Sequence, residues 1–160
     1  MSVHLPHPAA FRWYLAGSSL WMTAISLHGL LIAWIFVGIL ETSAGTYAWI
    51  RFFMELAPLA VLLLGGLWAD RTDARNLILF LGLFAVVLPL LLIPFAVSIT
   101  LQVAFLFGLG MALLQALSDP ARQSIINRVT RFDIQRTVTV ATLTTTLAGL
   151  VGVWIGGKLE

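Results

Sequence analysis

The chain has 160 residues, of which 60% are hydrophobic and 10% charged, whereas soluble domains average about 45–50% and about 25%. A water-soluble fold could not bury so much apolar surface, and the mean hydropathy of +1.00 therefore predicts an all-α bundle of membrane-spanning helices. The sequence pI of 9.7 rests on a net charge of only +2, which basic residues gathered on one membrane side explain better than nucleic-acid binding. The absence of cysteine excludes disulfides and thiolate metal sites.

Five charge-poor stretches reach or approach the roughly 20 residues that a membrane-spanning helix needs. The first is far longer than the roughly 7–15 apolar residues of a cleaved signal peptide, so we expect a retained span. Residues 77–117 carry no charge over a length that crosses the bilayer twice, and Pro94, Ser98 and Thr100 indicate where the chain turns back. The expected spans are about 13–40, 49–68, 77–97, 100–117 and 138–155.

The arginines predict the orientation of these spans. Five spans place the N-terminus, residues 70–75 and residues 118–136 on the same side of the membrane. That side carries Arg12, Arg71, Arg75, Arg122, Arg128, Arg131 and Arg136, whereas the other side carries Lys158 and, near its surface, Arg51. Because cytoplasmic loops are enriched in Lys and Arg, we expect an integral membrane protein with a cytoplasmic N-terminus.

The segment 119–136 has two interpretations. Ile125, Ile126, Val129 and Phe132 recur at helical spacing, and Asp119 followed by Pro120 is typical of a helix start. One interpretation is an amphipathic cytoplasmic helix over about 120–134 that lies along the membrane surface. The other is a cytoplasmic extension of the fourth span.

Small residues recur every four positions on two of the expected spans. They are Gly108, Ala112 and Ala116 on the fourth, and Ala148, Gly152 and Gly156, followed by Gly157, on the fifth. Small side chains allow helix backbones to approach closely in lipid. We interpret these faces as helix-packing surfaces rather than as ligand sites.

Ionisable residues inside the membrane are candidates for function because they are costly there. His28 lies near the middle of the first span, either as a substrate or proton site or as a neutral imidazole bonded to a hydroxyl such as that of Ser26 or Thr23. Arg51 and Glu55 stand four apart on the second span and share a face. They form either a cavity-facing site for a cation, proton or substrate, or a structural ion pair near the outer surface.

The sequence indicates no enzymatic chemistry, cofactor or metal. His4, His7 and His28 lack metal-ligand spacing with any carboxylate. A Walker loop and a nucleophile elbow are both missing from the sequence. We therefore expect a protein that is not an enzyme.

Three segments resemble the N-terminal part of a major facilitator superfamily transporter. The stretch GLWADRTDAR, 66–75, is similar to the family's loop between spans two and three, with Gly66, Asp70, Arg71 and Arg75 at matching positions. Asp73 replaces a usual glycine, and Ala74 replaces a basic residue. The stretch DPARQSIINRV, 119–129, resembles the end of span four in the branch that includes siderophore and multidrug exporters, and GVWIGGKL, 152–159, is similar to the span-five motif without its proline.

The resemblance implies a transporter of twelve helices in two halves, with a small-molecule substrate bound between them. It also implies the inner membrane of a bacterium. The chain then supplies about five helices of the N-terminal six-helix half, and its partner is a C-terminal half that is missing here. Ala104 and Ile25 stand where relatives often carry an arginine and an acid, which weakens any claim of the usual proton coupling.

The motif residues suggest a cytoplasmic gate. As the resemblance implies it, Asp70 lies beside the positive N-terminus of a helix in the other half. Arg71 or Arg75 pairs with Asp119, and Arg122 belongs to the same cluster. These contacts form a latch that stabilises the outward-open state.

Two functions fit the sequence. The first is a secondary transporter that exports small amphipathic organic molecules by alternating access. The second is a stand-alone small membrane protein that scaffolds or regulates a partner through its Gly and Ala helix faces. The gene downstream of codon 160 distinguishes them, because a transporter needs further spans.

Overall fold

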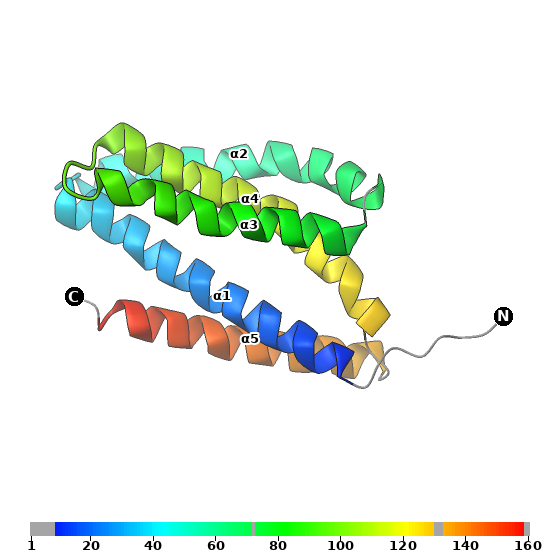
Figure 1. Cartoon of the computed structure of the whole chain (residues 1–160). Helices are drawn as coiled ribbons and strands as arrows, with labels where there is room; N and C mark the ends of the chain where they lie inside the picture. The colour runs from blue at the N-terminus through cyan, green and yellow to red at the C-terminus, as the bar shows by residue number, and fades with distance from the viewer. Residues whose placement is uncertain (1–8, 72, 130–132, 159–160) are drawn as a thin grey trace. The chain divides into compact units, whose positions relative to one another are not determined.

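The computed structural model describes residues 9–71, 73–129 and 133–158, with the side chains of 63–71 and of Asn127 outside the description. The predicted all-α class is confirmed, since the described residues form helices joined by short turns and contain no strand. Five α-helices follow one another along the chain (Figure 1): α1 (Ala10–Trp34), α2 (Ala44–Arg71), α3 (Ala74–Leu92), α4 (Leu101–Val129) and α5 (Ile134–Gly156). A π-helix, η1 (Ile35–Ile39), extends α1, and a 3-10 helix, η2 (Ile93–Phe95), extends α3.

The chain is an integral membrane protein. Four helical segments of the described part are long and apolar enough to cross a bilayer: Ala10–Ile39, Ala74–Phe95, Leu101–Ile126 and Ile134–Gly156. The helix α2 has 28 residues, also more than a bilayer requires, but carries Arg51 and Glu55 and includes residues whose side chains are not described. Large apolar side chains point outward along these helices, with Leu83 60% and Leu147 62% exposed. Lipid rather than water suits such a surface.

The described residues divide into two compact units, the first formed by residues up to Leu31 and from Gln123, the second by Ile32–Arg122. In the first unit α1 and α5 run side by side (Figure 1). Thr23 of α1 contacts α5 at Ala148, and Leu30, further along α1, lies next to Gly156, further along α5. The two helices are therefore parallel.

The second unit contains the end of α1 with α2, α3 and α4. Met54 of α2 is 2% exposed and lies against Gly108 of α4, together with Ile32 from the end of α1. Leu88 of α3 lies against Gly110 of α4. The core of this unit therefore surrounds α4. Its buried side chains are all apolar: Ile32, Phe36, Met54, Leu81, Ala104, Phe107 and Met111.

In the turn between α1 and α2, the backbone hydrogen bonds span more residues than in an α-helix. The amide of Leu40 donates to the carbonyl of Ile35 at 2.9 Å, and that of Thr42 donates to Phe36 at 2.9 Å, across five and six residues. Glu41 adopts a left-handed φ of 48°, a conformation that favours glycine. Ser43 then accepts a hydrogen bond from the amide of Thr46 at 3.2 Å and begins α2.

The chain turns back between α3 and α4. α3 ends at Leu92, Pro94 lies in η2, and the amide of Ser98 donates to Phe95 at 3.1 Å. The hydroxyl of Thr100 accepts from the amide of Val103 at 3.4 Å, next to the first residue of α4. The proline, serine and threonine thus lie in and around the turn, where the sequence analysis put them.

The segment 120–129 continues α4 and does not form a separate surface helix. Asp119 and Pro120 lie inside α4, so the interpretation of Asp119 as a helix cap is wrong. Ser118 and Ala121, on either side of this pair, are almost completely buried, so the packed face of α4 extends through it. A proline removes one backbone donor but is tolerated where the rest of the helix is held by packing. Residues 130–132, within the predicted amphipathic helix, lie outside the described residues.

Candidate functional site

The predicted gating motif covers the end of α2, the turn after it and the start of α3. α2 extends through Arg71, and α3 begins at Ala74. The carboxylate of Asp73, just before α3, accepts a hydrogen bond from the backbone amide of Arg75 at 3.2 Å. Asp73, which replaces the family's usual glycine, therefore acts as a helix cap. Gly66, Asp70 and Arg71 have a helical backbone, but their side chains lie outside the described residues.

The rest of the predicted gate lies on α4. Asp119 and Arg122 are three residues apart on this helix, and their charges interact. Arg75 is exposed, and within the described part of the chain it forms no ion pair with Asp119. Asp119 and Arg122 thus lie close enough for their charges to interact, whereas the described residues do not contain the predicted pair of Arg75 with Asp119. The pair of Arg71 with Asp119 falls on a side chain that is not described.

Arg51 and Glu55 form a direct ion pair on α2. The Arg51 Nη2 lies 2.7 Å from the Glu55 Oε1, and the two side chains are 45% and 57% exposed. Glu55 lies eleven residues after the first residue of α2, about 16 Å along the helix axis. An ion pair this exposed contributes about 0.2–1 kcal/mol to stability in water. The attraction between the two charges therefore does not by itself explain why both residues occur on this helix.

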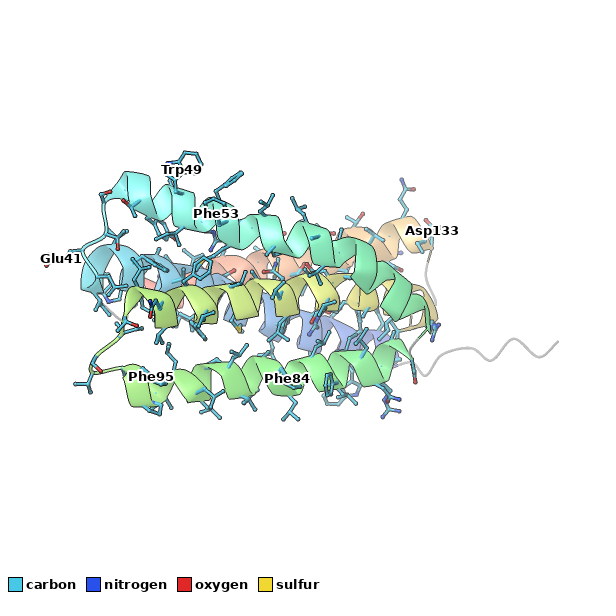
Figure 2. The ribbon with its side chains drawn as sticks, turned by 90° about the horizontal axis from the view of Figure 1, so that it is seen from above. Glu41, Trp49, Phe53, Phe84, Phe95 and Asp133 are labelled. Carbon is cyan, nitrogen blue, oxygen red and sulfur yellow. The ribbon has the colours of Figure 1, made fainter. Side chains whose placement is uncertain are left out.

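The surroundings of this pair differ on the two flanks of α2. Met54 marks the buried face, and Arg51 and Glu55 lie at one edge of it. On the other side Trp49 and Phe53 are 66% and 55% exposed and point away from the helix (Figure 2). Their rings, 6.5 Å apart between centroids, form an aromatic surface that suits lipid headgroups. The ion pair therefore lies on a different flank of the helix from these two rings.

His28 lies partly buried on α1 and takes part in an interaction within the chain. The hydroxyl of Thr23, one partner considered from the sequence, donates to the backbone instead. It lies 3.0 Å from the carbonyl of Ser19 and 2.9 Å from that of Ala148 on α5. Thr23 therefore joins α1 to α5.

The glycines of the small-residue faces contact other helices of the chain. A methyl group added at Gly152 would lie 2.5 Å from the carbonyl oxygen of Thr23, and one at Gly156 would lie 2.6 Å from the Cδ1 of Leu30. At Gly108 it would lie 2.7 Å from the Cε of Met54. Such close approach leaves these three positions no room for a second chain.

Ala112 and Gly157 differ from these three glycines. Ala112 is partly buried on α4, next to the buried Met111. Gly157 follows the last residue of α5, and its amide donates to the carbonyl of Val153 at 2.9 Å. A methyl group there would meet only backbone atoms of its own helix end. Gly157 therefore ends α5 and does not pack against another helix.

A polar face on α5 was missed in the sequence analysis. Its side chains are exposed and recur at spacings of three and four: Gln135, Thr139, Thr142 and Thr146. The spacing was visible in the sequence, but threonine is also common in helix contacts. Only the structure shows that α1 covers a different face of α5.

The described residues contain no cluster of His, Cys, Asp or Glu that could hold a metal ion. Comparisons with protein-family models, with curated proteins and with solved structures found no match. None of these comparisons bears on the resemblance to the major facilitator superfamily, which consists of the three sequence segments quoted above.

Proposed function

We propose that the chain is the N-terminal part of a secondary transporter of the major facilitator type. It lies in a bacterial inner membrane with a cytoplasmic N-terminus and exports small amphipathic organic molecules by alternating access. A second half of the transporter, outside the 160 residues, completes the substrate site. In this proposal the gating motif from Gly66 to Arg75, at the end of α2 and the start of α3, lies on the cytoplasmic side.

The observation that carries the proposal is the exposed Arg51–Glu55 pair on α2. Charged side chains in hydrocarbon are costly, and inside membrane proteins they usually face a cavity or a partner. Here both are about half exposed while Trp49 and Phe53 lie on a different flank. Water or a polar group of the cargo is a better neighbour for this flank than a lipid chain. In this proposal Glu55 holds a cationic group or a proton, and Arg51 keeps the carboxylate in place between transport cycles.

The scaffold hypothesis receives less support. It requires Gly and Ala faces that are free to bind another chain. Gly152 and Gly156 lie against α1, and Gly108 lies against Met54 of α2. The faces that would recruit a partner are therefore already in use within the chain.

The test is dye extrusion by the complete product of the gene. Bacteria that lack their main efflux pumps are loaded with ethidium or Hoechst 33342, and the rate of loss is measured with and without the expressed protein. We expect faster loss with the protein and a rate reduced to that of empty cells in Glu55→Gln. The control is Glu41→Gln, which changes an exposed carboxylate in the turn before α2 and should leave extrusion unchanged.

Two outcomes would overturn the proposal. One is dye loss that is the same with and without the expressed protein for a panel of cationic, neutral and anionic amphipathic dyes. The other is a stop codon directly after codon 160 together with wild-type extrusion in Glu55→Gln. A parallel Asp70→Asn variant tests the gating motif, because an intact rate there would remove Asp70 from the mechanism.

A further inference from the structure

The ion pair on α2 shares its side of the helix with a proline. Residues at spacings of four and then three lie in one row along an α-helix, so Arg51, Glu55 and Pro58 form such a row. Proline has no amide hydrogen and cannot donate to the carbonyl four residues before it. In α2 that carbonyl belongs to Met54. The row therefore combines a guanidinium, a carboxylate and a backbone carbonyl that Pro58 leaves without its helical donor.

Phe52 gives this row an apolar border. It lies three residues before Glu55, which places the two side chains about 60° apart around the helix. Its ring is 54% exposed and lies 6.0 Å from the ring of Trp49 and 5.6 Å from that of Phe53, measured between centroids. An amphipathic molecule can therefore place its apolar part on these rings and its polar groups on the row.

The charge of the row decides which polar groups fit. The two charged side chains lie 2.7 Å apart and are 45% and 57% exposed, so the row is neutral as a whole and open to a ligand. A purely cationic ligand on Glu55 takes the counter-charge from Arg51 and lies beside a like charge. A purely anionic ligand on Arg51 has the same disadvantage at Glu55. A ligand that carries both charges leaves neither side chain without a partner.

The carbonyl of Met54 favours a protonated amine as the cationic group. An ammonium group has several N–H donors, and a carboxylate and a carbonyl side by side accept two of them. A quaternary ammonium has no N–H donor and gains nothing from the carbonyl. The guanidinium of Arg51 presents its donors in a planar fork, which matches the two oxygens of a carboxylate or a phosphate.

We propose that this row on α2 binds an amphipathic zwitterion as the cargo. The protonated amine of the cargo bonds to the Glu55 carboxylate and to the Met54 carbonyl. Its anionic group bonds to Arg51, and its apolar part lies on Phe52. The substrate class rests on the proposed transport function and narrows it from amphipathic molecules in general to those with both charges.

Four ligands built on one dansyl group test the charge requirement. Nα-dansyl-lysine carries an amine and a carboxylate, and dansylcadaverine lacks the carboxylate. Nα-dansyl-Nε-acetyl-lysine lacks the positive charge, and the Nε-trimethyl compound lacks the N–H donors. Binding is measured by isothermal titration calorimetry on the complete protein in lipid nanodiscs, with protein-free nanodiscs as the blank. We expect dansyl-lysine to bind at least about tenfold more tightly than each of the other three, the effect of one charge-assisted hydrogen bond.

Single variants assign each charge to its side chain. In Arg51→Gln dansyl-lysine should lose its advantage over dansylcadaverine, and in Glu55→Gln it should lose its advantage over the acetylated compound. Glu41→Gln changes an exposed carboxylate in the turn before α2 and should keep both ratios. Equal affinities for dansyl-lysine and dansylcadaverine in the unchanged protein would overturn the proposal. So would an Arg51→Gln variant that keeps the ratios of the unchanged protein.

Pro58→Ala tests the carbonyl. Alanine restores an amide that can donate to Met54 and is the best helix former, so α2 should stay folded. We expect the advantage of dansyl-lysine over its trimethyl analogue to disappear, whereas its advantage over dansylcadaverine should remain. An unchanged preference for the free amine would overturn the role of the carbonyl.

The same ligands separate the zwitterion site from the transport function. Extrusion of ethidium or Hoechst 33342 by a protein that binds all four ligands equally would leave the transporter and overturn the zwitterion site. Tighter binding of dansyl-lysine by a protein that extrudes neither these dyes nor dansyl-lysine would support the site and overturn the transport function.

Discussion

The contact between α1 and α5 and the contact between α2 and α4 both centre on a glycine, but the two glycines meet different atoms. Gly152 on α5 faces a backbone carbonyl, that of Thr23, whereas Gly108 on α4 faces the end of the Met54 side chain. A carbonyl can move only with its helix, but a methionine has three rotatable bonds. The first contact is therefore a rigid approach of two backbones, and the second is an adaptable side-chain contact.

The difference matters because hydrophobic attraction between helices is weak in lipid. Close packing and hydrogen bonds between helices then decide which helices associate. The α1–α5 contact has both, since Thr23 also donates its hydroxyl to Ala148 at 2.9 Å. We therefore expect the contact of α1 with α5 to stay rigid and the contact of α2 with α4 to adjust.

The largest expected effect tests the rigid contact. Gly152→Ala would place a methyl group 2.5 Å from the Thr23 carbonyl oxygen, so α1 and α5 must separate. We expect a loss of about 3 kcal/mol, the upper end for overpacking, measured by denaturant titration in detergent micelles. Gly17→Ala is the control, since nothing lies within 4 Å of its added methyl group. A loss no larger than that of the control would show that α5 does not approach α1 this closely.

The next effect tests the adaptable contact. Gly108→Ala would place a methyl group 2.7 Å from the Met54 Cε, which can turn aside. We expect a loss of about 1 kcal/mol, because overpacking a flexible neighbour lies at the low end of its range. The double variant with Met54→Ala should lose less than the sum of the two single changes, because the smaller side chain makes room. Additive losses would contradict the assigned contact.

A smaller effect measures the hydrogen bond of the rigid contact. Thr23→Val keeps the branched shape of the side chain but removes the donor to Ala148. We expect a loss of about 0.6 kcal/mol, the average for hydrogen bonds between membrane helices. The matched control is Thr139→Val, whose hydroxyl bonds only within α5. If the two losses are equal, the bond between the helices adds nothing to their association.

The smallest effect separates stability from transport at the charged flank of α2. Glu55→Gln removes the charge that lies 2.7 Å from Arg51, but both side chains are about half exposed. We expect a change in stability of no more than about 0.5 kcal/mol, the upper end for exposed ion pairs four residues apart on a helix. Thermal denaturation followed by size-exclusion chromatography measures it. A larger loss would make the pair structural and would remove the support for a transport role.

The sequence predicts the helices well because lipid imposes a simple requirement. Long uncharged stretches must be helical there, and Pro94, Ser98 and Thr100 mark the turn because backbone groups in a turn need polar neighbours or water. Gly152 and Gly156 were expected to pack, and the structure places both against α1. A spacing of four residues is a local property that the sequence alone displays.

Other features depend on which face of a helix is covered, and the sequence does not contain this information directly. Asp119 and Pro120 have the composition of a helix start, but burial of Ser118 and Ala121 continues α4 through them. The spacing of the polar side chains on α5 is present in the sequence, but only the structure shows that α1 covers the face of Gly152 and leaves these side chains exposed. The left-handed Glu41 has no sequence signal, since glycine or asparagine is usual at such a position.

In the proposed topology the chain crosses a bilayer repeatedly and the α2–α3 turn lies on the cytoplasmic side. Single cysteines at two exposed turn positions test it: Asp73→Cys, before α3, and Ser98→Cys, before α4. With a membrane-impermeant maleimide, we predict labelling of Ser98→Cys in intact cells and of Asp73→Cys only after the membrane is permeabilised. Labelling of Asp73→Cys in intact cells would contradict the account.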